Sequence, residues 1–284
     1  MKKITLVLLI ALCSRVFAQS GAGYFVSADG NDANDGLSES APLKTLDEAI
    51  YRTSLTEIKK ITVTGALTVE NSDLKQGGEF VFLLLGFSGN DELLVTGRPA
   101  AAGAERAVLS GRDSLMPVVL AASGNIRFEH IEISGGEGAI GIGLYIDNGA
   151  TVTLGPGAVV RGNQSIGVFI GEGTCVIEGG EVRDNMNIGV AVDSFGVLTM
   201  LSGSVKDNRS QSAGGGVLIA ERGRFNMVGG TITDNSAVQW GGGVEVRAGG
   251  SFNQVGGTIS GNDAPQFPDV ARSKRSLGLD LSRQ

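Results

Sequence analysis

Short stretches of alternating apolar and polar residues recur through residues 143–269. One unit shows the pattern clearly: Val217-Leu218-Ile219, then Phe225-Asn226-Met227-Val228, then Thr231-Ile232-Thr233, each separated from the next by glycine or a polar turn. Strict alternation over a few residues is typical of a β-strand that buries one side. The pattern therefore predicts three short strands in each unit.

The units repeat five times and share both their ends. Each opens with glycine and an apolar alternation, at Gly143, Gly167, Gly189, Gly216 and Gly243. Each closes on asparagine, in steps of 22, 23, 27 and 27 residues, at Asn163, Asn185, Asn208, Asn235 and Asn262. A period of this length with three strands and no room for a helix favours a β-solenoid. The fold class predicted is all-β, a single-stranded right-handed parallel β-helix.

Matching positions of the units are apolar, which identifies the side chains that should face inward. Stacked coils lie about 4.8 Å apart, so these columns would bury continuous aliphatic ladders. The asparagine column is interpreted as a structural ladder, because asparagine tolerates the left-handed backbone of a sharp turn and can stack amide on amide. The inward columns are Val168, Ile170, Val190, Val192, Val217, Ile219, Val244 and Val246.

The chain before the repeats is less regular and is divided accordingly. Residues 61–142 are predicted to form the first, irregular coils, with strands at 61–64, 80–83, 93–95, 118–120 and 131–133 and a loop at 98–105. Residues 19–60 are predicted to form a strand, an Asp/Asn/Gly-rich turn and a helix that caps the first coil. Thr45 and Glu48 match a capping box at the start of this helix. Residues 143–269 are the five regular repeats, and 270–284 form a C-terminal tail or cap.

The N-terminal entry resembles a known family. The pattern Gly30-Asn31-Asp32, Asp35-Gly36, Pro42, Thr45 and Ala49 is similar to the N-terminal signature of the pectate-lyase-like right-handed parallel β-helix repeat proteins. The later G-T-I-x-x-N units resemble repeats of bacterial β-helix surface proteins and adhesins. The resemblance implies the fold, but it leaves the activity open, because this superfamily contains lyases, hydrolases and non-catalytic surface proteins.

The first 18 residues are predicted to be a secretory signal peptide. Lys2 and Lys3 precede an apolar run, 4–12, and Val16-Phe17-Ala18 forms a cleavage site before Gln19. The apolar run is far shorter than the roughly 20 residues that span a bilayer, so no transmembrane segment is expected. The alternative is a lipoprotein anchored through Cys13. Both predict an exported protein of the periplasm, cell surface or extracellular space.

The charge of the chain restricts its expected partners, and its cysteine content restricts the type of fold. The chain has a net charge of −7, and the signal would remove three positive charges. An acidic chain without basic patches is not expected to bind nucleic acid. Two cysteines, one of them in the predicted signal, exclude a disulfide-stapled scaffold.

The strand that opens each unit carries the candidate chemistry on its outward side. Asp147 and Asp193 would lie two coils apart, about 9 to 10 Å, near the upper limit for an inverting glycosidase pair. They are weak catalytic candidates, since no basic residue stands near them to act as a lyase base, and a solvated-turn role explains them as well. Catalytic residues are therefore predicted to be absent. The outward columns are Tyr145, Phe169, Ala191, Leu218 and Glu245, then Asp147, Gly171, Asp193, Ala220 and Arg247.

Metal and cofactor sites are not expected, with Ca²⁺ as the alternative. Asp29, Asp32 and Asp35 are weak candidates because hard oxygen ligands are dense in the N-terminal turn, but they lack EF-hand spacing and Asx turns account for them. The stacked acids Asp184, Asp207 and Asp234 are explained more simply as turn residues. His130, placed by alternation on the same side of a strand as Phe128, is taken as structural or merely exposed.

Aromatic residues suggest a binding surface. Tyr145 and Phe169 should be neighbours on adjacent coils, and Trp240 lies in an extended loop, so the three are predicted to bind a sugar. The leading hypothesis is a non-enzymatic, adhesin-like surface or extracellular protein that binds a glycan or a surface protein. The alternative is a polysaccharide lyase or glycoside hydrolase of the pectate-lyase-like superfamily. The oligomeric state is left open.

Overall fold

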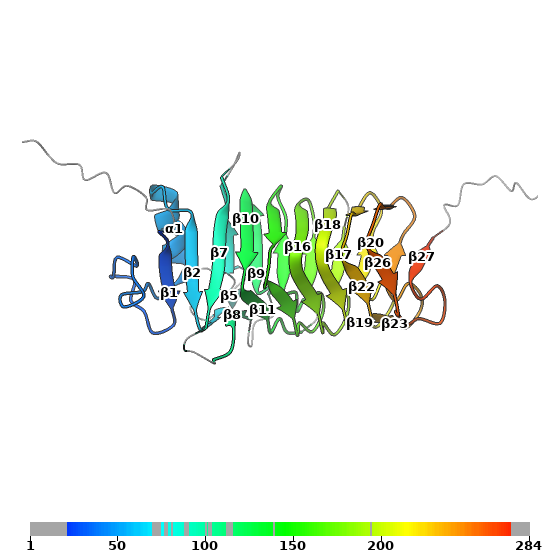
Figure 1. Cartoon of the computed structure of the whole chain (residues 1–284), viewed down its shortest axis with the longest axis horizontal. Coiled ribbons are helices and arrows are strands. Elements are labelled where there is room, and N and C mark those ends of the chain that lie inside the picture. Colours follow the sequence, from blue (N-terminus) through cyan, green and yellow to red (C-terminus); the bar gives the residue numbers. More distant parts are fainter. Residues whose placement is uncertain are drawn as a thin grey trace, which may run out of the picture.

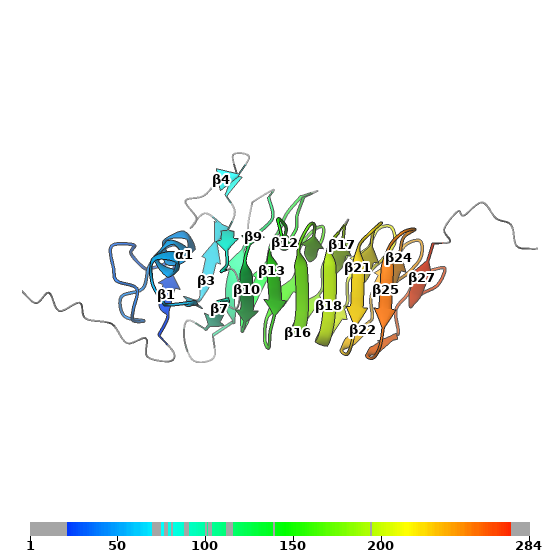
Figure 2. The same ribbon diagram turned by 90° about the horizontal axis from the view of Figure 1, so that it is seen from above.

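The computed structural model describes residues 22–273, apart from 70–74, 77–78, 81, 88–90, 100, 102–103, 112–115, 139 and 194. The predicted signal peptide with Cys13, and Gln19 after it, lie outside the described residues, as does the predicted tail from residue 274 onward. The described chain is a rod of stacked strands with one helix at its N-terminal end (Figures 1 and 2). None of the described helices is both long enough and apolar enough to cross a membrane.

Three faces run along the rod. The first face comprises β6 (Phe82–Leu85), β9 (Val119–Ser123), β12 (Leu144–Ile146), β15 (Val168–Ile170), β17 (Val190–Val192), β20 (Val217–Ile219), β24 (Val244–Val246) and β27 (Val270–Arg272). The second comprises β1 (Tyr24–Ser27), β2 (Lys60–Thr64), β7 (Leu93–Arg98), β10 (Asn125–Glu129), β13 (Thr151–Leu154), β21 (Arg224–Met227), β25 (Ser251–Gln254) and the first parts of β16 (Thr174–Arg183) and β18 (Val197–Lys206). The third comprises β3 (Ala66–Thr68), β8 (Ala107–Ser110), β11 (Ile131–Ser134), β14 (Val159–Arg161), β22 (Thr231–Thr233), β26 (Thr258–Ser260) and the last parts of β16 and β18.

Strands pair in parallel with the equivalent strands of neighbouring coils. On the first face Val168 pairs with Val190, which pairs with Val217, which pairs with Val244. The same in-register pairing links the coils on the other two faces. The predicted fold class, an all-β parallel β-helix, is therefore confirmed.

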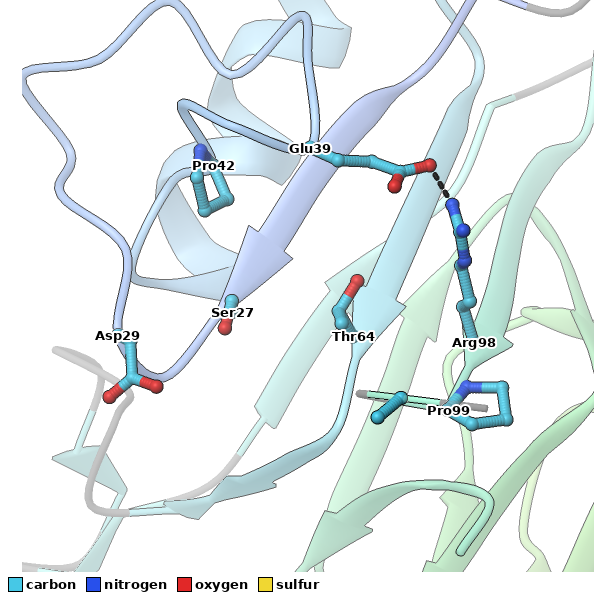
Figure 3. Close-up of a pocket in the computed structure, with 8 residues that line it drawn as sticks. Ser27, Asp29, Glu39, Pro42, Thr64, Arg98 and Pro99 are labelled. Carbon is cyan, nitrogen blue, oxygen red and sulfur yellow. Dashed lines mark ion pairs between the residues drawn. The ribbon is translucent and has the colours of Figure 1, made fainter. Parts of the chain in front are cut away.

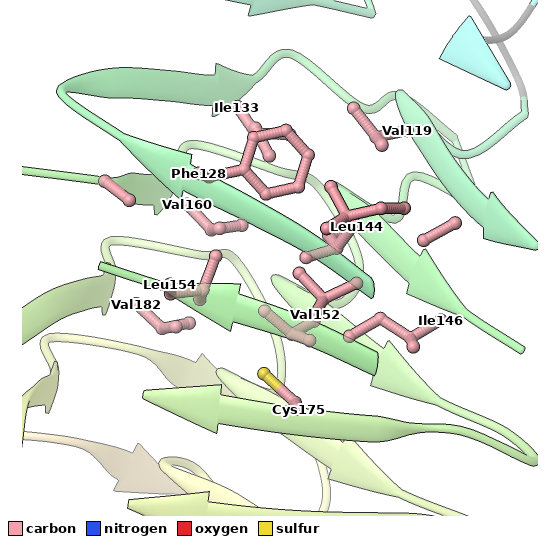
Figure 4. Close-up of a cluster of buried hydrophobic side chains, with 14 of the residues drawn as sticks. Val119, Phe128, Ile133, Leu144, Ile146, Val152, Leu154, Val160, Cys175 and Val182 are labelled. Carbon is pink, nitrogen blue, oxygen red and sulfur yellow. The ribbon is translucent and has the colours of Figure 1, made fainter. Parts of the chain in front are cut away.

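The core is a column of aliphatic side chains inside the three faces. Val190, Val217 and Val244 are fully buried, and so are Val152 and Leu154 on the second face. Figure 4 shows such side chains converging from all three faces in the middle of the rod. Burial of each large aliphatic side chain contributes about 1.5 to 3 kcal/mol to the free energy of folding. One coil alone would bury few of them, so the stability of the rod depends on stacking.

The asparagines form the predicted ladder along one corner. The Nδ2 group of Asn185 donates to Oδ1 of Asn208 at 2.8 Å, and the backbone N–H of Asn185 donates to the same oxygen at 3.1 Å. The pattern repeats from Asn163 to Asn262. At the C-terminal end Asn262 donates to Oδ1 of Asp269 at 3.0 Å. All five side chains are buried, so each amide replaces water with protein partners.

The expectation that the asparagines themselves adopt the left-handed backbone is wrong. The residue before each asparagine has the positive φ: 54° at Asp184, 57° at Asp207 and 58° at Asp234, with Gly162 and Gly261 in the other two units. Asparagine instead keeps its side chain inside the corner, where the ladder needs it. The short polar Asp and the Cβ-free Gly tolerate the turn.

The glycine that opens each unit makes room for this ladder. A Cβ atom on Gly189 would lie 2.6 Å from Nδ2 of Asn208, and one on Gly167 would lie 2.6 Å from Nδ2 of Asn185. Glycine is the residue that fits against a buried amide at this distance. The opening glycine and the closing asparagine of the units thus pack against each other in the structure.

Extra residues in the 27-residue units form two additional short strands, β19 (Arg209–Ser210) and β23 (Ser236–Ala237), which pair in parallel. They lie in the segment between the third face and the first. The difference in repeat length therefore falls in one corner of the rod. A separate pair, β4 (Lys75–Gln76) and β5 (Glu79–Phe80), lies outside the regular units and is antiparallel.

The helix α1 (Leu46–Leu55) covers the first coils with Leu46 and Ala49, which are fully buried. The capping box is only half formed. Oγ1 of Thr45 accepts from the N–H of Glu48 at 3.2 Å, as predicted. The N–H of Thr45 donates instead to Oδ1 of Asp32 at 3.0 Å, because Glu48 forms an ion pair with Arg52 at 2.6 Å.

The irregular coils contain strands that the sequence pattern did not indicate, namely β3, β4, β8 and β10. The placement of His130 is also corrected. Phe128 is buried on β10, whereas His130 is exposed and has a φ of 52°. The chain turns at His130 from the second face to the third, so the two side chains do not share one strand.

We predict that Asn208→Ala destabilises the protein by about 3 kcal/mol. The substitution leaves the buried donors of Asn185 without an acceptor, and each orphaned group costs about 1 to 3 kcal/mol. Urea unfolding followed by circular dichroism would measure the change. Asn253→Ala, at an exposed position of β25, is the matched control and should change stability by less than about 0.5 kcal/mol. Equal losses for the two variants would contradict the importance of the ladder.

We also predict that Cys175 does not react with thiol reagents in the folded state. Burial raises the pKa of this thiol to about 12, so at pH 8 only about one molecule in 10⁴ would carry the reactive thiolate. A Cys13→Ser variant isolates Cys175 for reaction with Ellman's reagent. Reaction should be complete in denaturant and absent on the same time scale without it. Fast labelling of the native protein would contradict this burial.

Candidate functional site

The outward side of the first face is partly roofed by the segments that precede its strands. Tyr145, Phe169, Ala191, Leu218 and Glu245 are in register on successive coils, as expected. Ala191, Leu218 and Glu245 are nevertheless buried. Apolar residues from the preceding segments cover the column, since Ile166 and Ile188 pack with Phe169, Ala191 and Leu218.

A hollow of about 840 Å³ lies over the N-terminal part of this face. One wall is apolar and comes before the strands; the opposite wall follows the strands and carries the acids. Its floor includes the rings of Tyr145 and Phe169. The hollow is lined by Met116, Pro117, Leu120, Ala122, Ile140, Ile142, Tyr145, Asp147, Asn148, Phe169, Gly171, Glu172 and Asp193.

A second hollow, of about 660 Å³, follows on the same face toward the C-terminal end. Asp193 lines both hollows. The two are therefore neighbours, and together they are called the first-face groove. The second hollow is lined by Asp193, Ser212, Ala213, Ala220, Glu221, Gln239, Trp240, Glu245, Arg247, Ala248 and Ser273.

Tyr145 and Phe169 form an aromatic pair in the first hollow. Their ring centroids are 5.1 Å apart and the rings meet edge to face at 73°. The hydroxyl of Tyr145 donates to Oδ2 of Asp147 at 3.3 Å. The pair thus presents partly exposed ring surface next to a carboxylate, a combination suited to the apolar and polar sides of a sugar.

Asp147 is held in place on both oxygens. Oδ1 accepts from the backbone N–H of Glu172 at 3.0 Å, and Oδ2 accepts from Tyr145. Its carboxylate occupies the space over Gly171, where a Cβ would lie 2.8 Å from Oδ1. Asp193 follows β17, one coil beyond Gly171, and is exposed. The structure thus brings Asp147 and Asp193 into the same hollow, with Asp147 engaged in local hydrogen bonds.

The surroundings of Tyr145 raise the pKa of its hydroxyl. Partial burial is the largest cause, followed by the negative charge of Asp147 and the hydrogen bond to it; Asp193 and Glu172 add to the effect. Each of these disfavours a tyrosinate. Tyr145 therefore stays a neutral hydrogen-bond donor to Asp147, and no basic side chain is among the described residues that line this hollow.

Trp240, Glu245 and Arg247 form the centre of the second hollow. The indole Nε1 of Trp240 donates to Oε1 of Glu245 at 3.0 Å, and Nε of Arg247 lies 3.5 Å from the same oxygen. Glu245 is only 3% exposed, and its Oε2 has no hydrogen-bond partner. A buried carboxylate stands here in a column that is otherwise aromatic or aliphatic.

The acids of the groove are unlike those of the other faces. On the second face Arg127 lies 2.6 Å from Glu129 and 2.6 Å from Glu178. On the third face Arg161 lies 2.7 Å from Glu132. Among the described residues that line the groove, Arg247 is the one basic side chain, against the five acids Asp147, Glu172, Asp193, Glu221 and Glu245.

The N-terminal turn, where Ca²⁺ was the alternative, is organised by a side chain of the protein. Arg52 donates to the backbone carbonyls of Asp32, Asn34 and Asp35. Asp32 accepts from the backbone N–H groups of Lys44 and Thr45. In the described part of the chain no three His, Cys, Asp or Glu side chains gather as a metal site would require.

Another hollow, of about 570 Å³, lies beside this turn (Figure 3). Glu39 and Arg98 point toward each other across it and form an ion pair, with both side chains about half exposed. Asp29 lies at its edge, and no aromatic residue lines it. Because the two opposite charges neutralise each other and are exposed to solvent, this pair leaves little net charge to attract a ligand. The first-face groove is therefore the better candidate site.

The structure brings most of the predicted site residues together. Tyr145, Phe169, Asp147 and Asp193 share one hollow, and Trp240 lies in the other. Other residues of the lining were not indicated by the sequence. The apolar wall from Met116, Ile140 and Ile142 was missed, because it lies in segments without a repeat. Glu245 was recognised as charged and outward, but not as buried. The signal for it was a lone acid in an apolar column.

We predict that Asp147→Asn lowers the pKa of Tyr145 while leaving it above its ordinary value. The variant removes the charge of Asp147 and retains the burial, which is the larger cause. Tyrosinate absorbance followed during an alkaline titration would measure the shift. Asp234→Asn, on another side of the rod, is the control and should leave the titration unchanged. An unaltered curve in Asp147→Asn would contradict the contact between the two side chains.

Comparison with known proteins gives likenesses of fold alone. No protein-family model matches the chain, and no curated protein matches it. The chain is similar to the solved structure of pectate lyase Pel9A, with 14% identity over 89% of this chain and 78% of that chain and a TM-score of 0.49. It is also similar to a GH136 lacto-N-biosidase from Eubacterium ramulus, with 11% identity over 89% and 68% and a TM-score of 0.38. The strand pairing of the chain itself establishes the parallel β-helix that its N-terminal signature predicted.

Proposed function

We propose that this chain is an exported, non-enzymatic β-helix protein that binds an elongated glycan in the first-face groove. The observation that carries the proposal is the groove itself. It comprises two neighbouring hollows along successive coils and places aromatic rings beside hydrogen-bonding groups: Tyr145 and Phe169 in one hollow, Trp240 in the other.

The shape of the groove suits a polymer. Tyr145 and Glu245 are separated by four steps of the coil, or about 19 Å at the usual strand spacing. Two neighbouring hollows separated by this distance suit a ligand of several sugar residues in a row. The regular floor of parallel strands holds the lining side chains rigidly, so binding costs little ordering of the protein.

The polar groups of the groove favour binding over catalysis. Asp147 accepts hydrogen bonds on both oxygens, and Oε1 of Glu245 is engaged by Trp240 and Arg247. No histidine or lysine is among the described lining residues. A lyase would need a base of this kind near the carboxylates.

One observation favours a second candidate, a glycoside hydrolase. Asp147, Glu172 and Asp193 line the same hollow. Asp147 and Asp193 are two coils apart, about 9 to 10 Å, which lies at the upper limit for two carboxylates that activate a water between them. A hydrolase would use the same groove and the same class of ligand.

The proposal predicts selective loss of binding on removal of the groove aromatics. Binding is first found on a panel of neutral, acidic and amine-bearing oligosaccharides and then measured by isothermal titration calorimetry. Tyr145→Ala and Trp240→Ala should each weaken binding about tenfold, equivalent to about 1.4 kcal/mol for one lost stacking contact. Tyr51→Ala, which removes an exposed aromatic from α1, is the matched control and should bind as the unaltered protein does.

Two results would contradict the proposal. One is the failure of every glycan on the panel to bind. The other is the release of new reducing ends from a bound glycan, with loss of that release in Asp193→Asn, which would establish the hydrolase instead.

A further inference from the structure

We propose that the second hollow of the first-face groove is an ammonium-binding subsite, which takes a protonated amine such as that of a de-N-acetylated hexosamine. The inference rests on the proposed function and names the class of glycan for the same groove. It is argued from the burial of Glu245, the charge of the hollow and the aromatic side chain beside them.

Glu245 occupies a position where the fold buries its charge. Its Cα partners on the adjacent coils are Leu218 and Ala271, and both of these are also buried. A carboxylate at 3% exposure is costly unless hydrogen-bond donors and positive charge surround it. An acid in this column therefore needs partners that its aliphatic equivalents do not.

The protein supplies those partners to one oxygen only. Trp240 and Arg247 both approach Oε1, at 3.0 and 3.5 Å. Oε2 has no hydrogen-bond partner in the described structure. Glu245 lines the hollow. An incompletely satisfied, buried carboxylate at a hollow is the independent sign that a donor from a ligand belongs there.

The charge of the hollow selects a cation over a neutral donor. Asp193, Glu221 and Glu245 outnumber the single Arg247, which leaves a net charge of −2 among the described lining residues. Arg222, outside the lining, lies 4.0 Å from Oε1 of Glu221, so the surroundings of the hollow remain net negative even when this exposed pair is counted. A sugar hydroxyl would supply a donor but would leave this charge unbalanced. An ammonium group supplies three donors and a positive charge, whereas a uronate would be repelled.

Trp240 adds a second attraction for a cation. Its side chain is 38% exposed and lines the same hollow. An indole ring attracts ammonium groups through its negative face, more strongly than tyrosine or phenylalanine rings do. Carboxylates beside an exposed tryptophan thus recognise an amine on a sugar ring by charge, hydrogen bonding and contact with the ring.

Calorimetry with two tetrasaccharides tests the subsite. The probes are the β-1,4 tetramer of glucosamine and the same tetramer of N-acetylglucosamine, which differ in the charge of the amine. At pH 6 and low salt, the glucosamine tetramer should bind at least about tenfold more tightly to the unaltered protein. Raised salt should reduce this preference, because screening weakens interactions between exposed charges.

Variants assign the preference to this hollow. Glu245→Gln keeps the size of the side chain and removes its charge, and it should reduce the preference for the amine about tenfold. Asp193→Asn, at an exposed position, should reduce the preference for the amine by a smaller factor. It replaces Glu245→Gln as the test of the subsite if Glu245→Gln does not fold. Asp234→Asn makes the same charge change outside the groove and should retain the full preference.

The outcomes separate this inference from the proposed function. Equal binding of both tetramers, or an undiminished preference in Glu245→Gln and Asp193→Asn, overturns the ammonium subsite and leaves a neutral-glycan groove standing. Failure of both tetramers to bind, while other glycans on the panel do, also overturns the subsite alone. Absence of binding to any glycan overturns both.

Discussion

The structure depends on the stacking of one coil on the next in strict register. A single coil has few inward side chains and leaves its strand edges unpaired, so it has no stable core of its own. Parallel pairing places Val168, Val190, Val217 and Val244 in one column and buries all of them. The asparagine ladder enforces the same register at the corner, because each amide bonds to the equivalent amide one coil further on. Glycine beside it keeps the corner tight.

Register in the core also determines the surface. Since successive residues of a strand point to opposite sides, a fixed inward column creates a fixed outward column. The coils differ in length at one corner, where the extra residues of the longer units form β19 and β23. Segments from this corner lead into the first face and roof part of its outward side, which gives a groove rather than a flat sheet. Trp240 reaches the groove from such a segment.

Charge distinguishes this groove from the rest of the rod. The second and third faces pair their acids with arginine across coils, as Arg127 and Arg161 do. The groove leaves most of its carboxylates without basic partners among its lining residues, and it buries one of them at Glu245. A net acidic groove disfavours polyanions such as polyuronates and favours neutral or amine-bearing ligands. The chemistry of the lining therefore bears on function more directly than the fold, which many activities share.

The sequence by itself determined the repeat, the parallel β-helix and the neighbours Tyr145 and Phe169, because a fixed period converts position in the chain into position in space. It also placed Asp147 and Asp193 two coils apart. It did not determine which residue turns each corner, which is the Asp or Gly before the ladder asparagine. It also did not determine that Glu48 would pair with Arg52 instead of completing the capping box. The tertiary structure alone decided the roof over the first face and the burial of Glu245. Both arise from packing between segments that follow no period, and such contacts depend on the whole coil rather than on local pattern.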